Sequence, residues 1–205
     1  MKRIKVGVIG LAVFTALCGS AHAGDAKIGE MTGEAFIVGK DGIYRAKTGM
    51  AANAGDVVMT RQGGQLDLIV NGQAGCLMLA DSVVAIANTD QERTKLMVAE
   101  GNVVLNIKPL TPGSEFTVDT PSAVATVRGT QFWGRVTGGE GEAVSTFAVK
   151  EGSVRVTAKE SGKTVDLSAG QAVDLAEQAA DVNARSATAG EMDAMKAADL
   201  IAKRM

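Results

Sequence analysis

Apolar and polar residues alternate with a period of two through most of the chain between residues 31 and 175. In the segment NVVLNIK, Val103, Leu105 and Ile107 fall on one face, and polar residues fall on the other. The segments SVRVTA (153–158) and GQLDLIV (64–70) repeat this pattern, which is typical of half-buried strands. Glycine-rich turn segments such as GKDG, RQGG and TGGEGE separate the strands. We therefore predict an all-β fold, namely a β-sandwich of many short, mainly antiparallel strands.

A weak internal repeat leaves a second architecture open. The segments VAEGNVVLNIK (98–108) and VKEGSVRVTAK (149–159) share Val, Glu-Gly, Val and a closing Lys at the same places. Duplicated hairpin units would explain this similarity, although two copies do not establish a repeat array. A short β-solenoid is therefore the alternative to the sandwich.

The pattern changes after Leu175. Residues 176–189 are alanine-rich and polar, which predicts a linker after a β-domain that occupies residues 24–175. Residues 190–205 begin with acidic and end with basic side chains, which favours a C-terminal helix. Its apolar stripe consists of Met192, Met195, Ala198 and Ile201. Such a stripe either docks on the sandwich or binds a partner.

The first 23 residues have the layout of a cleavable signal peptide. Lys2, Arg3 and Lys5 precede an apolar run over 6–17, and the small residues of AHA precede a cleavage site before Gly24. The run is too short to span a bilayer, so we expect secretion without stable membrane insertion after cleavage. A lipid anchor on Cys18 is disfavoured because bulky Leu17 precedes it.

Cleavage would also limit the chemistry that remains. The segment contains three of the 21 basic residues and none of the 23 acidic ones, so the rest carries a net charge of about −5. This acidic balance argues against nucleic acid or an anionic membrane as a partner. The segment also contains the only histidine, His22, and leaves Cys76 as the one cysteine.

Without histidine, Ser-His or Cys-His catalysis and histidine-liganded zinc are excluded, and one cysteine cannot form a thiolate cluster. We therefore predict no catalytic, metal or cofactor-binding residues, and no enzyme. Paired carboxylates could still hydrolyse a glycan, but the mature chain has few aromatic residues to form a carbohydrate platform.

The segment TPSAVATVRGTQFWGRV (120–136) contains the candidate structural residues. Pro121 lacks an amide donor and suits the start or edge of a strand, and Gly129 suits a bulge or a corner. Arg128 lies among apolar neighbours, where an arginine usually pairs with a carboxylate. We predict structural roles for Pro121, Arg128, Gly129 and Thr130, with ligand recognition by Arg128 as the alternative.

Trp133 and Arg135 are the candidate contacts with a partner. They share one face of a strand just before the TGGEGE turn, and Trp and Arg are enriched at binding hot spots. The alternative for Trp133, the only tryptophan, is burial against the sheet.

The spacing of several segments resembles the FecR domain family, a module named for the periplasmic part of the ferric-citrate signalling regulator. The matching text runs over residues 31–175 and consists of AGDVVMT, LDL, Ser82, VAEGNV, FTVDTPSAVATVRGTQF, VKEGSVRV and LSAGQ. This resemblance implies a non-catalytic periplasmic β-sandwich that makes protein contacts in the Gram-negative envelope.

The resemblance also limits the expected role. In the full regulator, an anti-sigma segment and a membrane helix precede the domain, whereas here we expect a signal peptide directly before it. The expected function is a protein-interaction, sensory or scaffolding module whose partner is another envelope protein. Because related domains occur beside wall-binding modules, a peptidoglycan- or glycan-associated structural module is the alternative.

Overall fold

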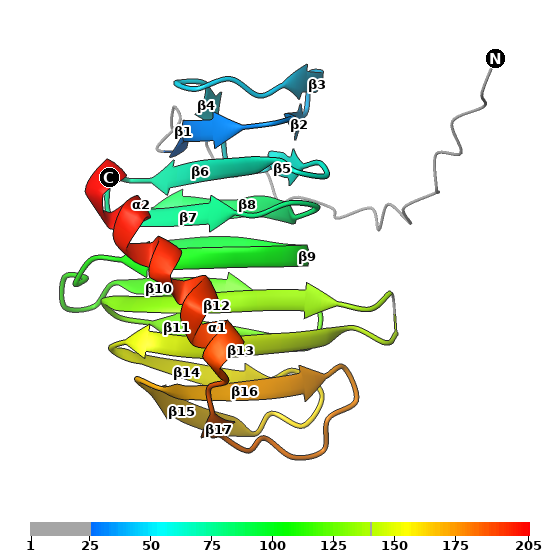
Figure 1. Ribbon diagram of the computed structural model, residues 1–205, viewed down its shortest axis with the longest axis vertical. Coiled ribbons are helices and arrows are strands. Elements are labelled where there is room, and N and C mark those ends of the chain that lie inside the picture. Colours follow the sequence, from blue (N-terminus) through cyan, green and yellow to red (C-terminus); the bar gives the residue numbers. More distant parts are fainter. Residues whose placement is uncertain (1–25, 140) are drawn as a thin grey trace.

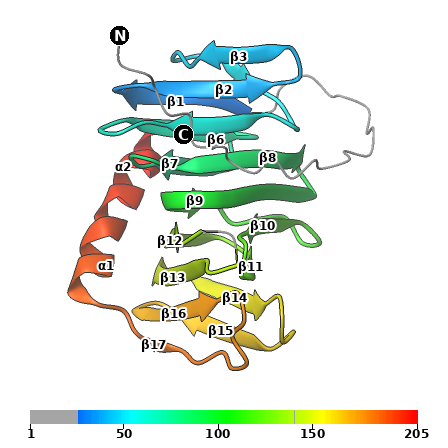
Figure 2. The same ribbon diagram turned by 90° about the vertical axis from the view of Figure 1, so that its right-hand side faces the viewer.

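The protein is a two-layered β-sandwich with one helix across an outer face (Figures 1 and 2). The structure is a computed structural model that describes residues 26–139 and 141–205. The signal peptide predicted over residues 1–23 lies outside the described residues. Apart from one parallel pair, β9 with β10, the pairings among the described strands are antiparallel. The predicted mainly antiparallel β-sandwich with a C-terminal helix is thus confirmed.

Layer A lies beneath the helix. Its strands, in the order in which they pair, are β4 (Ala51–Ala52), β1 (Ala26–Thr32), β6 (Gln65–Val70), β7 (Ala74–Met78), the second half of β9 (Arg93–Ile107), β12 (Thr130–Thr137), β13 (Val144–Glu151), β16 (Gln171–Ala176) and β17 (Arg185–Ser186).

Layer B forms the opposite side of the sandwich. Its strands, in pairing order, are β3 (Gly42–Arg45), β2 (Ala35–Gly39), β5 (Val57–Thr60), β8 (Val83–Asp90), the first half of β9, β10 (Glu115–Asp119), β11 (Ala123–Val127), β14 (Ser153–Ala158) and β15 (Thr164–Ser168).

Strand β9 belongs to both layers and therefore joins them into one hydrogen-bonded network. It pairs with β8 and β10 before Gly101, and with β7 and β12 after it. Gly101 has φ +93, and a Cβ at this position would lie 2.4 Å from Oγ of Ser82. Ser82 is buried and holds the bend, because its Oγ donates to the carbonyl of Asn102 at 3.0 Å and accepts from the amide of the same residue at 2.9 Å.

One apolar core fills the space between the layers. Its largest fully buried side chains include Phe116 and Leu96 from layer B and Phe132, Phe147 and Leu105 from layer A. The alternation seen in the sequence produces this core directly, since in β14 the buried residues are every second one. Burial of each large apolar side chain contributes about 1.5–3 kcal/mol.

The glycines of the VRGT and VKEGSV segments turn the chain from one layer to the other. Gly129 (φ +64) follows β11 of layer B and precedes β12 of layer A, whereas Gly152 (φ +83) takes the chain back from β13 to β14. These two corners touch, because a Cβ on Gly152 would lie 2.7 Å from the carbonyl oxygen of Gly129. Of the two repeated Glu-Gly segments, Glu151-Gly152 therefore forms a corner of the sandwich, and Glu100-Gly101 lies at the bend of β9.

The C-terminal helix crosses layer A obliquely, from β13 toward β6 (Figure 1). It consists of α1 (Ala189–Ala194), the 3-10 turn η1 (Met195–Ala197) and α2 (Ala198–Arg204). Thr188 and Glu191 form a capping box at its start, in which the Thr188 amide donates to Glu191 Oε2 at 2.7 Å. The segment expected to be a linker contains the two-residue strand β17. The apolar stripe of the helix docks on the sandwich, which was one of the two alternatives; the other was binding to a partner.

Candidate functional site

The two outer faces of the sandwich differ in what covers them. The helix covers much of layer A, whereas no described element lies over the outer face of layer B (Figure 2). On layer B, the strands nearest β3 point half-buried apolar side chains outward. We call this set the open face; it consists of Phe36, Val38, Val57, Met59, Val83, Ala85 and Met97.

Strand register assembles the open face as two neighbouring rows. In the first row, Phe36 lies opposite Met59, and Met59 lies opposite Val83. In the second row, Val38, Val57, Ala85 and Met97 lie side by side on β2, β5, β8 and β9. Such cross-strand neighbours touch, so the two rows form one contiguous apolar surface. The guanidinium carbon of Arg61 lies 5.8 Å from the Phe36 ring centroid at its border.

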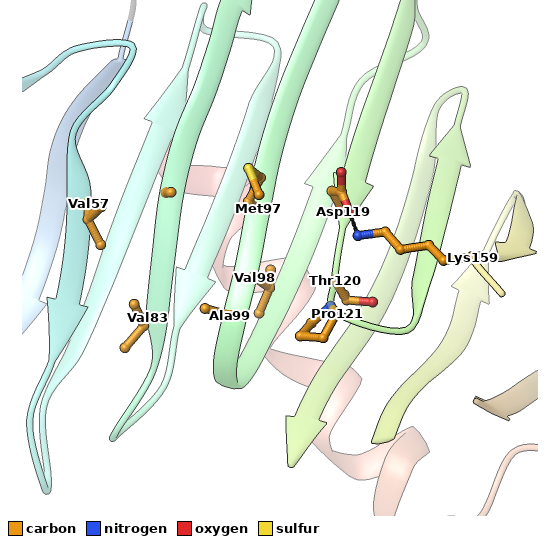
Figure 3. A pocket seen from close by; sticks show the side chains of 10 residues that line it. Val57, Val83, Met97, Val98, Ala99, Asp119, Thr120, Pro121 and Lys159 are labelled. Atoms are coloured by element: carbon orange, nitrogen blue, oxygen red, sulfur yellow. Dashed lines mark ion pairs between the residues drawn. The ribbon is translucent and has the colours of Figure 1, made fainter. Parts of the chain in front are cut away.

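A shallow pocket of about 260 Å³ lies on this surface (Figure 3). Val57, Val83, Ala85 and Met97 line its apolar part, and Asp119, Thr120, Pro121 and Lys159 line the other end.

The polar end of the pocket is held together by ion pairs. Asp119 is only 7% exposed, and its carboxylate lies 2.7 Å from Nζ of Lys95 and 2.5 Å from Nζ of Lys159. Both lysine side chains stay about 40% exposed. An apolar surface bordered by fixed charged groups is the composition of a protein-binding site.

The rest of the outer face of layer B is mostly polar, with Val124 as an apolar exception. Lys95, Thr117, Thr126, Arg155 and Asp166 form a row from β9 to β15. Arg155 donates to both carboxylate oxygens of Asp166, at 2.8 and 3.0 Å. The open face is therefore confined to one half of layer B.

The structure places Trp133 under the helix, where it is 6% exposed. It belongs to a second, smaller apolar cluster between layer A and the helix, made of Leu77, Val104, Trp133, Ala148, Ala172, Met195, Ala198 and Ile201. The indole is thus covered by the chain itself, as in the buried alternative. Trp133 is not available as a surface contact in this structure, which corrects the prediction that it meets a partner.

Arg135 is exposed on the same outer face of β12, two residues beyond Trp133. Its contact with a partner stays a prediction. Arg128 is also exposed, at the corner between β11 and β12, so the expectation of a buried arginine paired with a carboxylate is wrong. The reason is that Ala125 and Val127, its apolar neighbours in the sequence, face the core, so alternation along β11 directs Thr126 and Arg128 outward.

The other predicted structural residues lie at tight points of the chain. Pro121 lies in the turn between β10 and β11 and also lines the pocket. Gly129 has φ +64, and a Cβ at this position would lie 3.0 Å from Cα of Pro109, so a side chain here would strain the backbone and press on Pro109. Thr130 is buried, and its hydroxyl donates to the carbonyl of Ser153 at 2.9 Å.

The described residues present little reactive chemistry. Cys76 is buried in the core, and burial raises the pKa of its thiol to about 12, so it stays protonated. Within residues 26–139 and 141–205, no group of three His, Cys, Asp or Glu side chains could hold a metal ion. None of the helical segments in this part of the chain has the length and apolar composition of a membrane span.

A signal for the open face exists in the sequence. The strands that carry it contain consecutive apolar residues, such as Val57-Val58-Met59 and Leu96-Met97-Val98, whereas SVRVTA in β14 alternates strictly. Consecutive apolar residues place apolar side chains on both faces of a strand. Sequence reasoning used only the alternating strands and so missed this surface.

The solved structures that resemble this fold include two crystal structures, at 1.65 and 2.50 Å resolution, of a "putative anti-sigma factor" from Parabacteroides distasonis ATCC 8503. Both have a TM-score of 0.56 and 16% identity to this chain, which shows a shared fold. The match covers 67% of this chain but only 63% and 62% of those chains, so this protein spans less than two thirds of their length.

A search of curated proteins finds no match. The model of the family described as "FecR protein" matches residues 56–155. That stretch begins directly before β5 and ends in β14, and it includes Ser82, the β9 bend and both glycine corners. Over residues 56–155, this chain is therefore similar to the FecR family.

Proposed function

We propose that this protein is a non-catalytic regulatory module of the cell envelope, which binds another protein through the open face of layer B. The observation that carries the proposal is the contrast between the two outer faces. The helix buries the apolar residues of layer A, while the apolar rows of layer B stay uncovered. A contiguous exposed apolar patch bordered by polar residues is typical of protein-binding surfaces.

The regulatory part of the proposal is supported by the FecR domain, whose family is named for a signalling regulator. The Parabacteroides protein, itself described as a "putative anti-sigma factor", agrees with such a role. The non-catalytic part is supported by the protonated, buried Cys76 thiol and by the shallow pocket lined largely by Val, Ala and Met side chains.

The proposed location is the periplasm, and it rests on the signal peptide predicted over residues 1–23. Fractionation and intact-mass measurement test this directly. A periplasmic chain that begins at Gly24 supports the location, and a cytoplasmic chain that retains these residues contradicts it. The glycan-associated alternative has lost its main aromatic candidate, since Trp133 lies under the helix.

Binding by the open face is tested with two matched lysine substitutions in layer B. Met59→Lys places a charge in the apolar rows, whereas Thr126→Lys places the same charge on the polar half of the same outer face. Immobilised wild type and both variants are exposed to periplasmic extract, and the captured protein is identified by mass spectrometry, purified and titrated against each.

The expected result is that wild type and Thr126→Lys bind this protein alike, while Met59→Lys loses at least about tenfold in affinity because a lysine must be desolvated. Equal binding by all three chains would contradict the proposed surface.

A further inference from the structure

Strand β3 forms one edge of layer B and is exposed along its whole length. Ile43 is 71% exposed and Tyr44 is 45% exposed, and among the described strands β3 pairs only with β2. An exposed edge with apolar side chains is a template on which another strand can pair.

The opposite edge of layer B is protected. Strand β15 carries the exposed Asp166, which is held by Arg155, and the neighbouring Lys163 pairs with Asp181 at 2.5 Å. Charged side chains on an edge strand oppose the approach of another strand. Of the two ends of layer B, β3 is therefore the one open to pairing.

Backbone geometry fixes which residues of β3 face the free edge. The amide of Ala46 donates to the carbonyl of Ala35 at 2.8 Å, so these two residues form a hydrogen-bonded pair. Hydrogen-bonded and non-hydrogen-bonded pairs alternate along an antiparallel ladder. The Ile37–Tyr44 pair is therefore also hydrogen-bonded, and Ile43 and Arg45 direct their amides and carbonyls toward the free edge.

We propose that a second copy of this chain pairs with β3 in antiparallel fashion about a two-fold axis at Ile43. In this register Ile43 lies opposite Ile43 of the second copy. Asp41, in the turn that leads into β3, comes next to Arg45 in both directions, and Arg45 also contacts Glu34 of its own chain at 2.9 Å. The free backbone groups of Ile43 in the two copies then bond to each other, an apolar pair lies at the centre, and opposite charges flank it. Opposite charges facing across strands are stabilising. This self-complementarity is what an isologous two-fold contact requires.

The dimer would join two copies of layer B into one continuous layer. Ile43 pairs with Val38, which begins the second row of the open face, so the apolar rows of both copies would meet at the axis. The contact is short and should be weak and dependent on concentration. Self-association does not depend on the proposed partner, so it can be tested on the purified chain alone.

The charge pairing gives a sharp test by sedimentation velocity over a series of concentrations. Wild type should show a concentration-dependent dimer. Asp41→Arg and Arg45→Asp should each be monomeric, because each variant sets like charges opposite each other. An equimolar mixture of the two variants should dimerise again, because one chain then offers two cations and the other two anions.

Two further variants test the apolar centre. Ile43→Lys should be monomeric, whereas Leu200→Lys, which changes a residue of α2 that is 52% exposed, should dimerise like wild type. A wild type that stays monomeric throughout, or a mixture of charge variants that fails to dimerise, would overturn the proposal.

A disulfide trap gives an independent readout that does not rely on charge. Directly opposed residues of a hydrogen-bonded pair have Cα atoms about 5.5 Å apart, which suits a disulfide. Ile43→Cys should therefore form a covalent dimer under mild oxidation, whereas Leu200→Cys should not; Cys76 is buried and cannot interfere. Equal cross-linking of both variants would contradict the two-fold axis.

Discussion

The guanidinium of Arg204 lies 3.0 Å from the carboxylate of Asp67, and this ion pair ties the C-terminal helix to layer A. The Asp67 side chain is fully buried, while Arg204 is one third exposed and also contacts Glu30 at 3.0 Å. Burial raises the pKa of Asp67 above its ordinary value, and Arg204 opposes that shift. The helix therefore supplies the positive charge that a buried carboxylate needs.

Replacement of Arg204 should destabilise the fold through this carboxylate. We expect Arg204→Met to lower the free energy of unfolding by about 2–3 kcal/mol, because Asp67 would stay buried without its cation. Lys203→Met is the matched control, since it removes the same charge from an exposed neighbour. Urea unfolding measures both, and an equal, small effect of the two variants would contradict a stabilising role for the pair.

A fall in pH should weaken the ion pairs by which Arg185 joins Asp174 of β16 and Glu191 at the start of the helix. Its hydrogen bonds to Asp174 and Glu191 hold the pKa of both carboxyls below their ordinary values of 3.8 and 4.5. The folded state therefore binds these protons less tightly than the unfolded chain, so the stabilisation is full above roughly pH 5 and is lost as the pH falls.

Melting temperatures of wild type and Arg185→Gln between neutral and acid pH check this. The two curves should differ at neutral pH and converge at low pH, and the contribution of Asp67 cancels because both chains share it. A constant difference across the whole range would contradict the assignment.

The helix should be removable without loss of the sandwich, since its apolar cluster is separate from the main core. Ile201→Asp places a charge between the helix and layer A, where Ile201 is fully buried. The fluorescence of Trp133 should then shift to the red and become open to acrylamide, while the β-type circular dichroism persists. Leu200→Asp, at an exposed position of the same helix, should change neither; unchanged fluorescence in Ile201→Asp would show that Trp133 is not covered by the helix.

The VRGT corner should depend on its glycine and not on its arginine. Gly129→Ala should cost about 1–3 kcal/mol, because φ is +64 and the new Cβ would press on Pro109. Arg128→Ala should change stability by no more than about 0.5 kcal/mol, because the side chain is exposed. Chemical denaturation ranks the two variants, and a larger loss in Arg128→Ala would restore the structural ion pair expected from sequence.

The architecture could be predicted because alternation reports directly which side of a strand is buried. Val154 and Val156 of β14 face the core as their spacing predicts, and Gly129 forms a corner because few other residues adopt its backbone conformation. The resemblance to the FecR family is confirmed over residues 56–155. Within that stretch, Ser82 and the two corner glycines hold the crossings between the layers.

The surfaces could not be predicted in the same way. Whether Trp133 is exposed depends on a helix more than fifty residues later that lies across it, and nothing near position 133 records this contact. Arg128 is exposed because its apolar neighbours Ala125 and Val127 point to the opposite face of β11, into the core. The open face depends on which strands become neighbours, since Val57, Ala85 and Met97 are adjacent only in the folded sheet.

The most direct test of the central claim is photo-crosslinking in cells from two positions, 57 on the open face and 133 under the helix. A photoreactive residue at position 57 should give one protein adduct that disappears when Met59→Lys is added, whereas position 133 should give none with a folded chain. An adduct from position 133 and none from position 57 would show that the partner binds layer A instead, and that the open face is not the binding surface.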